Sequence, residues 1–447
     1  MPCESFLVNK LFQQFEHDGI AYVIVGDTRR FPQEIHGDTD IVTDSQSLSL
    51  IKSSLSQFCH NHNIQIVQIL QHEQSAWYYV LAWFNEAGQL NWFNPDICSD
   101  YFRFGQLFLK ADELLSDRIP KNNLKEDSPR IYTPAPSRGF IYYLLKKIDK
   151  GELNHRQEEY LNSVWDKEPT ESEKQIKRFW PKEDRTLLTS AAEKNEWAKV
   201  QAELPRLQKT LNETLSFSFR NWWFELARKV KRVIKPTGVL VVFLGSDGSG
   251  KSTVLAQVEH DLTPAFRRTR QYHLRPFFGQ PCAKTAPTKN PHDQEFRGLL
   301  SSFMKLFLWW ADFTVGYAIE VFPRLACSTF VLFDRYYYDL LIDPKRYRYG
   351  GPRWLAWLIG KCIPRPDVVI FLDAPAEVLM ARKQEISLAE LTSQRIAYRK
   401  LLRKMENGHV VDASRPLAEV RTEVARIILN FMEARTLHRL GVREKTP

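Results

Sequence analysis

Two spacings of apolar residues follow one another in the first part of the chain. Helical spacing comes first, with apolar residues three or four positions apart at Leu7, Val8, Leu11, Phe12 and Phe15. Four strand-like runs follow, over residues 21–25, 64–70, 77–84 and 90–98. A polar turn at residues 85–89 separates the last two runs, so we expect them to form a hairpin. This mixture predicts an α/β domain over residues 1–117.

The next part of the chain, residues 118–236, is charged and has helical patterns over residues 139–148 and 201–215. No combination of residues there suggests catalysis, so we interpret this part as a helical spacer or partner domain. It ends in a basic run, Arg228–Lys235, that follows two adjacent tryptophans. We interpret the run as the end of a helix and a linker. The alternative is a surface for a membrane or nucleic acid.

Strand-like and helical stretches alternate in the third part, residues 237–447. The strands are predicted at Val239–Leu244, Thr329–Phe333 and Asp367–Leu372. This alternation predicts a parallel sheet wrapped by helices. The most apolar stretch, residues 303–321, contains three charged residues. It therefore fails the requirement of about 20 apolar residues for a membrane span, and a buried helix is expected.

Composition narrows the class of protein only in part. The 447 residues are 43% hydrophobic and 26% charged, which suits two or three globular domains. The net charge of +9 favours anionic ligands such as nucleotides, nucleic acid or anionic lipid, without choosing among them. The six cysteines are scattered and the N-terminus lacks a signal-peptide pattern, so a reduced, cytoplasmic chain is expected.

The first strand of the third part leads directly into Gly-Ser-Asp-Gly-Ser-Gly-Lys-Ser-Thr, residues 245–253. This run matches the phosphate-loop pattern G-x-x-x-x-G-K-[ST] in full, and a helical pattern follows it. Lys251 is expected to reach the β- and γ-phosphates, and Ser252 to bind Mg²⁺. The predicted ATP-binding residues are Gly245, Gly248, Ser249, Gly250, Lys251, Ser252 and Thr253. ATP and Mg²⁺ are the predicted cofactors.

Three ordered blocks of the third part resemble the thymidylate kinase family. They are the phosphate loop with Asp247, the run Asp334, Arg335 and Tyr336 after a strand, and residues 366–375. The resemblance implies that Asp247 lies near the acceptor phosphate and Asp334 near the water shell of Mg²⁺. It also implies that Arg335 binds the acceptor phosphate, a task that suits the guanidinium fork. The alternative for Asp334 and Arg335 is a structural ion pair.

Phosphoryl transfer also needs cations that stabilise the charge spread over the transition state. The phosphate loop has Ser249 where some family members have an arginine. The resemblance therefore implies cations on a lid, where this chain has Arg382, Lys383, Arg395 and Arg399. Their helical spacing also fits charges on a solvated helix face. The predicted catalytic residues are Asp247, Lys251, Asp334, Arg335, Arg382, Lys383 and Arg395.

The segments expected to hold the acceptor differ from those of the family. The sequence His-Leu-Arg-Pro, residues 273–276, stands where an Arg-Glu-Pro-type segment is usual, and residues 339–351 differ from the usual thymine-contacting sequence. The candidate acceptor-binding residues are His273, Arg275, Arg335, Tyr336, Arg346 and Arg348. Taken alone, His273 is also typical of a satisfied core histidine. The resemblance thus supports phosphoryl transfer more firmly than it supports dTMP as the acceptor.

A second candidate site lies in the first domain. The first predicted strand leads to Gly26 and Asp27, and Asp38-Thr-Asp40 follows twelve residues after the glycine. This arrangement resembles the signature of the polymerase-β-like nucleotidyltransferases. Such sites place two carboxylates on one strand face and a third on a neighbouring strand, so that two Mg²⁺ ions are bound. Asp96 is the candidate for the third carboxylate.

The nucleotidyltransferase interpretation has weaker points. Asp100 is a reserve candidate for the third carboxylate, and Asp-x-Asp pairs are also frequent in turns. Asp27 replaces a small polar residue of that superfamily, and its charge would repel a triphosphate. Arg29 and Arg30 are close enough in sequence to compensate.

The leading hypothesis is an ATP- and Mg²⁺-dependent kinase of a nucleoside monophosphate, with dTMP as first candidate, joined to a domain with nucleotidyl-transfer activity. One alternative is a kinase of a sugar or cell-envelope precursor, which the altered acceptor segments suggest. Another is a nucleotide-sensing or nucleic-acid-binding regulator, which the basic charge suggests. The expected partners are a nucleotide and a small-molecule phosphate acceptor. Nucleic acid is not favoured, and a homodimer is left open.

Overall fold

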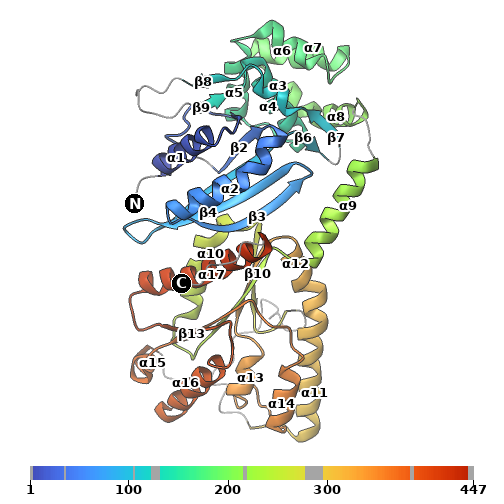
Figure 1. Cartoon of the computed structure of the whole chain (residues 1–447). Helices are drawn as coiled ribbons and strands as arrows, with labels where there is room; N and C mark the ends of the chain where they lie inside the picture. The colour runs from blue at the N-terminus through green and yellow to red at the C-terminus, as the bar shows by residue number, and fades with distance from the viewer. Residues whose placement is uncertain are drawn as a thin grey trace. The chain divides into compact units, whose positions relative to one another are not determined.

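The computed structural model describes residues 4–34, 37–103, 106–121, 131–214, 219–276, 295–382 and 387–440. The chain divides into two compact units, whose elements are labelled in Figure 1. The first unit comprises residues 1–87 and 91–229, and the second comprises residues 88–90 and 230–447. Helix α9 (Phe219–Ile234) contains the boundary at residue 229.

The first unit is built on a five-stranded mixed sheet with the strand order β1-β2-β5-β4-β3. The strands are β1 (Tyr22–Val25), β2 (Asp38–Thr43), β3 (Gln65–Glu73), β4 (Ala76–Phe84) and β5 (Leu90–Cys98). β2 is parallel to β5, whereas β1 is antiparallel to β2 and β3 is antiparallel to β4. The predicted strands and the hairpin of β4 and β5 are confirmed.

Both faces of β1 are buried, and its side chains alternate between two hydrophobic clusters. Tyr22 and Ile24 belong to the cluster of helices α1 (Glu4–His17) and α2 (Ser45–Asn61). Val23 and Val25 belong to the cluster of the helices described next. A strand buried on both faces has no polar positions, which explains its unbroken apolar sequence.

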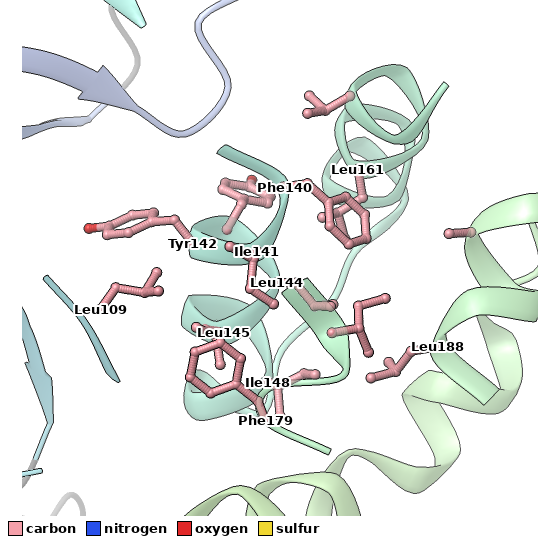
Figure 2. Close-up of a cluster of buried hydrophobic side chains, with 14 of the residues drawn as sticks. Leu109, Phe140, Ile141, Tyr142, Leu144, Leu145, Ile148, Leu161, Phe179 and Leu188 are labelled. Atoms are coloured by element: carbon pink, nitrogen blue, oxygen red, sulfur yellow. The ribbon is translucent and has the colours of Figure 1, made fainter. Parts of the chain in front are cut away.

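The helical part of the first unit consists of α4 (Pro136–Lys150), α5 (His155–Trp165), α6 (Pro169–Ile176), α7 (Lys182–Lys194) and α8 (Ala198–Thr214). Helix α4 begins with Pro136, where no backbone N–H needs a partner, and ends at Gly151, whose φ of 68° suits glycine. Its apolar side chains, among them Phe140 and Leu144, meet Leu161 of α5 in the cluster shown in Figure 2.

This cluster also contains β1 side chains, so the predicted first domain and the helical region share one hydrophobic core. Short elements connect them. They are β6 (Tyr101–Arg103) paired with β7 (Gln106–Leu109), α3 (Ala111–Leu115), and β8 (Ile119–Lys121) paired with β9 (Ile131–Thr133). The shared core makes the helices a part of the first unit.

The second unit contains a five-stranded sheet with the order β11-β12-β10-β13-β14, in which every neighbouring pair is parallel. The strands are β10 (Val239–Leu244), β11 (Arg268–His273), β12 (Thr329–Asp334), β13 (Val368–Asp373) and β14 (Gly408–Asp412). The three central strands are the predicted ones. The edge strand β11 has the polar sequence Arg-Thr-Arg-Gln-Tyr-His, which gives no strand pattern.

Helices cover both faces of this sheet, as predicted. They are α10 (Lys251–Leu262), α11 (Leu299–Ala311), α12 (Phe322–Ala326), α13 (Tyr338–Ile342), α14 (Arg353–Gly360), α15 (Ala376–Arg382), α16 (Leu388–Leu402) and α17 (Leu417–Leu440). Leu240, Val242 and Leu244 of β10 pack in one cluster with side chains of α11, α13 and α16. Helices α10 and α17 pack on each other and on the opposite face.

The expected buried helix over residues 303–321 is helical but not fully buried. It consists of most of α11 and a π-helical segment, Asp312–Val321. Leu306 and Trp309 are buried, whereas Met304 and Phe307 are 58% exposed. The prediction of burial is therefore wrong for one face of α11. Within the described ranges, no helix is long and apolar enough to cross a bilayer.

The core of the first unit should depend strongly on α4. Leu144→Ala removes a side chain that is 0% exposed and should lower the free energy of unfolding by about 2–5 kcal/mol, because it leaves a cavity. Urea unfolding measures this change. Leu50→Ala is the matched control, since Leu50 is 48% exposed and should change stability by less than about 0.5 kcal/mol. Equal effects of the two variants would contradict the packing described.

Candidate active site

The phosphate loop connects β10 to α10, as the sequence predicts. Gly248 and Gly250 have φ values of 83° and 80°, in the left-handed region that favours glycine. A Cβ on Gly245 would lie 2.7 Å from the Oγ of Ser249 and 3.0 Å from the carbonyl oxygen of Leu372. The three glycines thus allow the tight backbone curvature with which such loops bind phosphate at a helix N-terminus.

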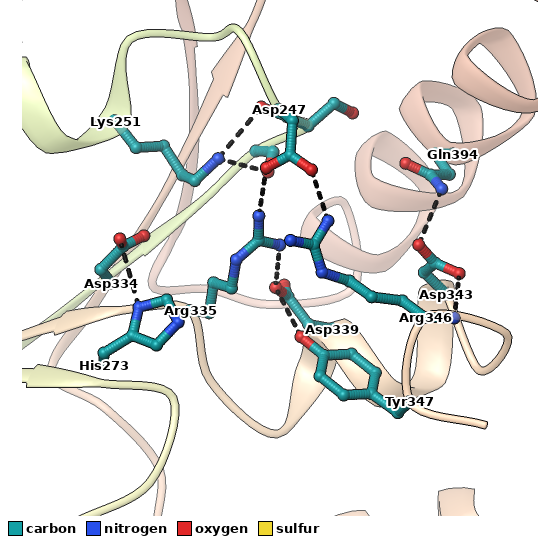
Figure 3. Close-up of polar contacts among 12 residues, drawn as sticks. Asp247, Lys251, His273, Asp334, Arg335, Asp339, Asp343, Arg346, Tyr347 and Gln394 are labelled. Atoms are coloured by element: carbon teal, nitrogen blue, oxygen red, sulfur yellow. Dashed lines mark hydrogen bonds and ion pairs between the residues drawn. The ribbon is translucent and has the colours of Figure 1, made fainter. Parts of the chain in front are cut away.

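Lys251, the first residue of α10, folds back over the loop. Its Nζ donates to the carbonyl oxygens of Gly245, at 2.8 Å, and Ser246, at 3.0 Å (Figure 3). Burial, and secondly the charge of Arg335, lowers the pKa of Lys251 to about 8. The ammonium group therefore lies beside the loop, where phosphate oxygens can replace the carbonyls as its acceptors.

Asp334 ends β12 and is brought beside β10 by the strand register, in which it is paired with Phe243. Its Oδ2 is 3.4 Å from Nδ1 of His273, the last residue of β11. Its Oδ1 is buried and has no hydrogen-bond partner among the described residues. Burial alone would raise the pKa of Asp334, but the hydrogen bond from His273 and the charges of Lys251 and Arg335 lower it below its ordinary value.

A buried guanidinium connects the loop to the segment after β12. Arg335 is 6% exposed, and its Nη2 is 2.5 Å from Oδ1 of Asp247 while its Nη1 is 2.9 Å from Oδ2 of Asp339. The other oxygen of Asp247 accepts a hydrogen bond from Arg346. Tyr398 of α16 donates to Oδ1 of Asp339 at 2.8 Å. These ion pairs hold the two arginines on the loop carboxylate.

Arg335 also has a strained backbone. Its φ of 76° is rare for a residue with a side chain and costs about 1–3 kcal/mol. The ion pairs of its guanidinium are with Asp247 and Asp339, whereas Asp334 pairs with His273. The alternative of a structural pair between Asp334 and Arg335 is therefore wrong.

Two of the predicted lid cations, Arg395 and Arg399, bind a carboxylate that was not among the predicted site residues, that of Asp373. Arg395 contacts Asp373 at the end of β13 through two hydrogen bonds, of 2.7 and 3.2 Å, and Nε of Arg399 contacts it at 2.7 Å. Arg382 donates to the carbonyl oxygen of Ala413, the residue after β14, at 3.2 Å. Lys383 lies outside the described residues. The solvated-face interpretation is wrong for Arg395, whose side chain is 19% exposed, and its catalytic role remains a prediction.

A pocket of about 1000 Å³ opens next to the pair of His273 and Asp334. His273 lines it with a side chain that is 57% exposed, so the core-histidine interpretation is wrong. Arg275 also lines it, together with Arg297, Lys305 and apolar side chains of α11. The pocket is thus lined by both cationic and apolar side chains, and Arg275 and Lys305 lie over the ring of Trp309.

The remaining predicted acceptor residues lie elsewhere. Tyr336 is 1% exposed and donates to the carbonyl oxygen of Pro364 at 2.8 Å, so it belongs to the core and the prediction that it binds the acceptor is wrong. Nε of Arg348 donates to the carbonyl oxygen of Glu295 at 3.0 Å. Arg346 is held by Asp247 at the phosphate loop. Of these three residues, Arg346 is the one at the loop.

Four residues of the site were not predicted from the sequence: Asp339, Asp373, Arg297 and Lys305. A signal for Asp373 is present, because an acidic residue directly follows the apolar run of β13. The carboxyl ends of parallel strands form the ligand-binding edge of such a sheet, so a charged residue at this position is a candidate. Asp339, Arg297 and Lys305 carry no such signal, since they follow no strand.

The residues at this edge fit a nucleoside triphosphate and Mg²⁺. The Oγ atoms of Ser246 and Ser249 are buried and have no hydrogen-bond partner in the described ranges. Ser252 is exposed at the start of α10, and Asp334 has its unpaired oxygen. No group of three or more His, Cys, Asp or Glu side chains in the described part of the chain is arranged to hold a metal. Mg²⁺ needs no such group, because phosphates and water commonly complete its coordination.

In the first unit, Asp40 and Asp96 are direct partners across the parallel pair of β2 and β5. Burial, and secondly the charge of Asp40, raises the pKa of Asp96 to about 7. Lys146 of α4 places Nζ 2.5 Å from Oδ1 of Asp40, and Tyr78 donates to Oδ1 of Asp38 at 2.6 Å. The structure thus brings the three predicted carboxylates to one region and adds a lysine that the sequence did not indicate.

The other predicted residues of this region have separate partners. Asp27 accepts two hydrogen bonds from the guanidinium of Arg29, at 2.8 and 2.9 Å, so this arginine compensates its charge as expected. Arg30 binds Glu34 instead. Asp100 accepts from the backbone N–H of residue 111 at 2.8 Å, which makes it a local structural residue and not the reserve metal ligand.

A five-stranded parallel sheet with a complete phosphate loop at its carboxyl edge defines the second unit as a P-loop phosphotransferase that uses ATP and Mg²⁺. The comparison with known families is consistent, since residues 243–424 match the thymidylate kinase family. The chain belongs to that family through its second unit. This membership supports nucleoside monophosphate kinase activity.

Three relatives illustrate the similarity. A probable thymidylate kinase of Pyrobaculum aerophilum is 30% identical over 194 residues, which are 42% of this chain and 95% of the relative. A probable thymidylate kinase of Archaeoglobus fulgidus is 28% identical over 207 residues, which are 43% of this chain and 96% of the relative. The thymidylate kinase of Alteromonas mediterranea is 26% identical over 211 residues, which are 44% of this chain and 91% of the relative. In each case nearly a whole relative corresponds to less than half of this chain.

The lowered pKa of Lys251 predicts that ATP affinity depends on pH. Binding to phosphate needs the protonated amine, and the free site loses this proton as pH rises through about 8. Bound phosphate favours the charged form, so above pH 8 the Kd for ATP should rise about tenfold per pH unit. Calorimetric titration between pH 7 and 9 measures this. Lys251→Met should bind weakly with a flat profile, and an equal slope in that variant would contradict the assignment.

Proposed function

We propose that the chain transfers the γ-phosphoryl group of ATP to a nucleoside monophosphate, with dTMP as the first candidate. The supporting observation is the cationic pocket at the sheet edge that also carries the phosphate loop. The contact between His273 and Asp334 joins the two. Arg275, Arg297 and Lys305 provide positive charge for an anionic acceptor, and the apolar side chains of α11 provide a surface for a base.

In this proposal an oxygen of the acceptor phosphate attacks the γ-phosphorus as the bond to the β,γ-bridging oxygen breaks, and ADP leaves. No side chain has to remove a proton, because the attacking phosphate oxygen is already anionic. Lys251 stabilises charge on the transferred group. Arg335 and Arg346 share Asp247 in the structure, and an acceptor phosphate would compete with that carboxylate for them. Mg²⁺ bound at Ser252 and Asp334 would neutralise charge on the β- and γ-phosphates.

A panel of acceptors tests this proposal. ATP consumption is measured with nucleoside monophosphates, nucleosides and sugars, and Lys251→Met serves as the blank. Turnover of dTMP should fall by about 100- to 1,000-fold in this variant, as loss of one transition-state contact does. Lys361→Met, which changes an exposed lysine of the same unit, should retain full turnover. Turnover of a sugar and none of dTMP would replace the proposed acceptor.

A second proposed activity is nucleotidyl transfer by the first unit. Its support is the direct pairing of Asp40 with Asp96 across β2 and β5, next to Asp38. Carboxylates on adjacent strands can supply the ligands of a two-metal site, although in this structure the described carboxylates are not arranged to hold an ion. Lys146 lies on Asp40 and would have to yield its place to an ion. The activity therefore requires that this contact opens.

The double variant Asp38→Asn with Asp40→Asn tests the second activity. Pyrophosphate release from nucleoside triphosphates should fall at least about 100-fold, because the metal ligands lose their charge, while kinase turnover stays unchanged. The control is Asp112→Asn with Asp117→Asn, two exposed residues of the same unit. Absence of release by the unmodified protein, or equal release by the variant, would refute nucleotidyl transfer.

A further inference from the structure

Helix α9 exposes its apolar face. With 3.6 residues per turn, its apolar side chains, apart from Phe224, share an arc of about 140° that contains no charged residue. The exposed members of this arc are Phe219 (70%), Trp222 (43%), Trp223 (60%), Leu226 (39%), Val230 (49%), Val233 (49%) and Ile234 (71%). A surface helix of a globular protein normally turns such a stripe toward the core. The apolar arc of α9 does not face the core, so it needs another apolar environment that removes it from water.

The opposite side of α9 is polar, and this side contacts the protein. Arg228 lies on the far side of the helix from the apolar arc and donates to the carbonyl oxygen of Gln71 in β3 at 3.3 Å. Its Nη2 is 2.6 Å from Oε2 of Glu225, and both side chains are largely covered, at 16% and 14% exposure. The helix is thus attached through its polar side, which leaves the apolar arc directed outward.

Cations border the apolar arc on both sides. On the helical wheel Lys229 lies about 20° beyond one edge of the arc and Lys231 about 40° beyond the other. Both are exposed, as is Lys235 after the end of the helix. The helix contains a single acidic residue, Glu225, and it is paired with Arg228. Long lysine stems at these positions can follow an apolar surface and place their charge in a layer of anionic groups.

These features together match one kind of partner. Nucleic acid would satisfy the lysines but would leave the leucine, valines and isoleucine in water. A second copy of the helix would bury those residues, but it would bring the same cations together. An interface of anionic phospholipids satisfies both, since Trp222 and Trp223 suit the headgroup level and the aliphatic side chains reach the acyl boundary.

We propose that α9 is a membrane-surface helix, which lies in the plane of a bilayer containing anionic phospholipids. At about 1.5 Å per residue its 16 residues measure about 24 Å, so the helix is too short to span the bilayer and lies along the surface. This inference does not depend on the acceptor of the kinase.

Co-sedimentation with vesicles tests the proposal on the full-length protein. It should bind vesicles of phosphatidylcholine with phosphatidylglycerol, bind pure phosphatidylcholine much more weakly, and be released by high salt. Trp223→Glu with Leu226→Glu should weaken binding about a hundredfold, because two inserted side chains are lost. Lys229→Gln, Lys231→Gln and Lys235→Gln together should weaken it by a similar factor, at about fivefold per cation.

Two matched variants control for surface changes elsewhere in the first unit. Phe6→Glu with Leu50→Glu alters two exposed apolar residues, at 44% and 48% exposure, and should bind like the unmodified protein. Lys182→Gln, Lys194→Gln and Lys199→Gln alter three exposed lysines and should do the same. Circular dichroism and thermal unfolding check that every variant is folded, and the salt and lipid dependence of the unmodified protein tests the proposal without any variant.

Three results would overturn the proposal. The first is no sedimentation of the unmodified protein with anionic vesicles. The second is a loss of dimers in the Trp223→Glu and Leu226→Glu variant, measured by light scattering, with unchanged vesicle binding, which would assign the face to a second copy. The third is reduced affinity of the lysine variant for RNA with unchanged vesicle binding, which would assign the cations to nucleic acid.

Discussion

The burial of one guanidinium, that of Arg335, determines how the residues at the carboxyl edge of the second unit's sheet are arranged. A buried charge is tolerated only when it is paired and hydrogen-bonded. Arg335 meets this condition through Asp247 in the phosphate loop and Asp339 in α13, and it keeps a left-handed backbone to do so. Asp339 is in turn fixed by Tyr398 of α16. The phosphate loop, α13 and α16, which are far apart in the sequence, are therefore connected through a single side chain. The position of the loop relative to the two helices depends on it.

The same principle of internal neutralisation recurs at carboxylates of other strands. Asp373, the last residue of β13, is bound by Arg395, and Asp40 of β2 is bound by Lys146. The ammonium group of Lys251 likewise donates hydrogen bonds to carbonyl oxygens of the phosphate loop. In each case a ligand would find no bare charge but an existing contact that it must replace. Binding at these positions is an exchange of partners, so its free energy is the difference between two sets of interactions and is smaller than that of the new set alone.

The sequence was sufficient for the features that depend on local pattern. The phosphate loop, the central strands β10, β12 and β13, and the hairpin of β4 and β5 all have short-range signals, and the structure has them at the predicted places. Features that depend on tertiary contacts were missed. The polar strand β11 is defined only by its pairing with β12, and the ion-pair partners Asp339, Asp373 and Lys146 are defined only by the fold. Tyr336 follows a charged motif in sequence, yet packing turns it into the core.

The strand order of the second sheet has a consequence for synthesis on the ribosome. The central strand β10 is the first of its sheet to be made, but its two neighbours, β12 and β13, begin at Thr329 and Val368. At about 5–20 residues per second, the strand and its loop wait on the order of ten seconds for both partners. During this time six consecutive apolar residues have no sheet to join and are prone to aggregate. The residues of the first unit up to residue 229 have by then been synthesised, so nascent chains need protection mainly while the kinase half emerges.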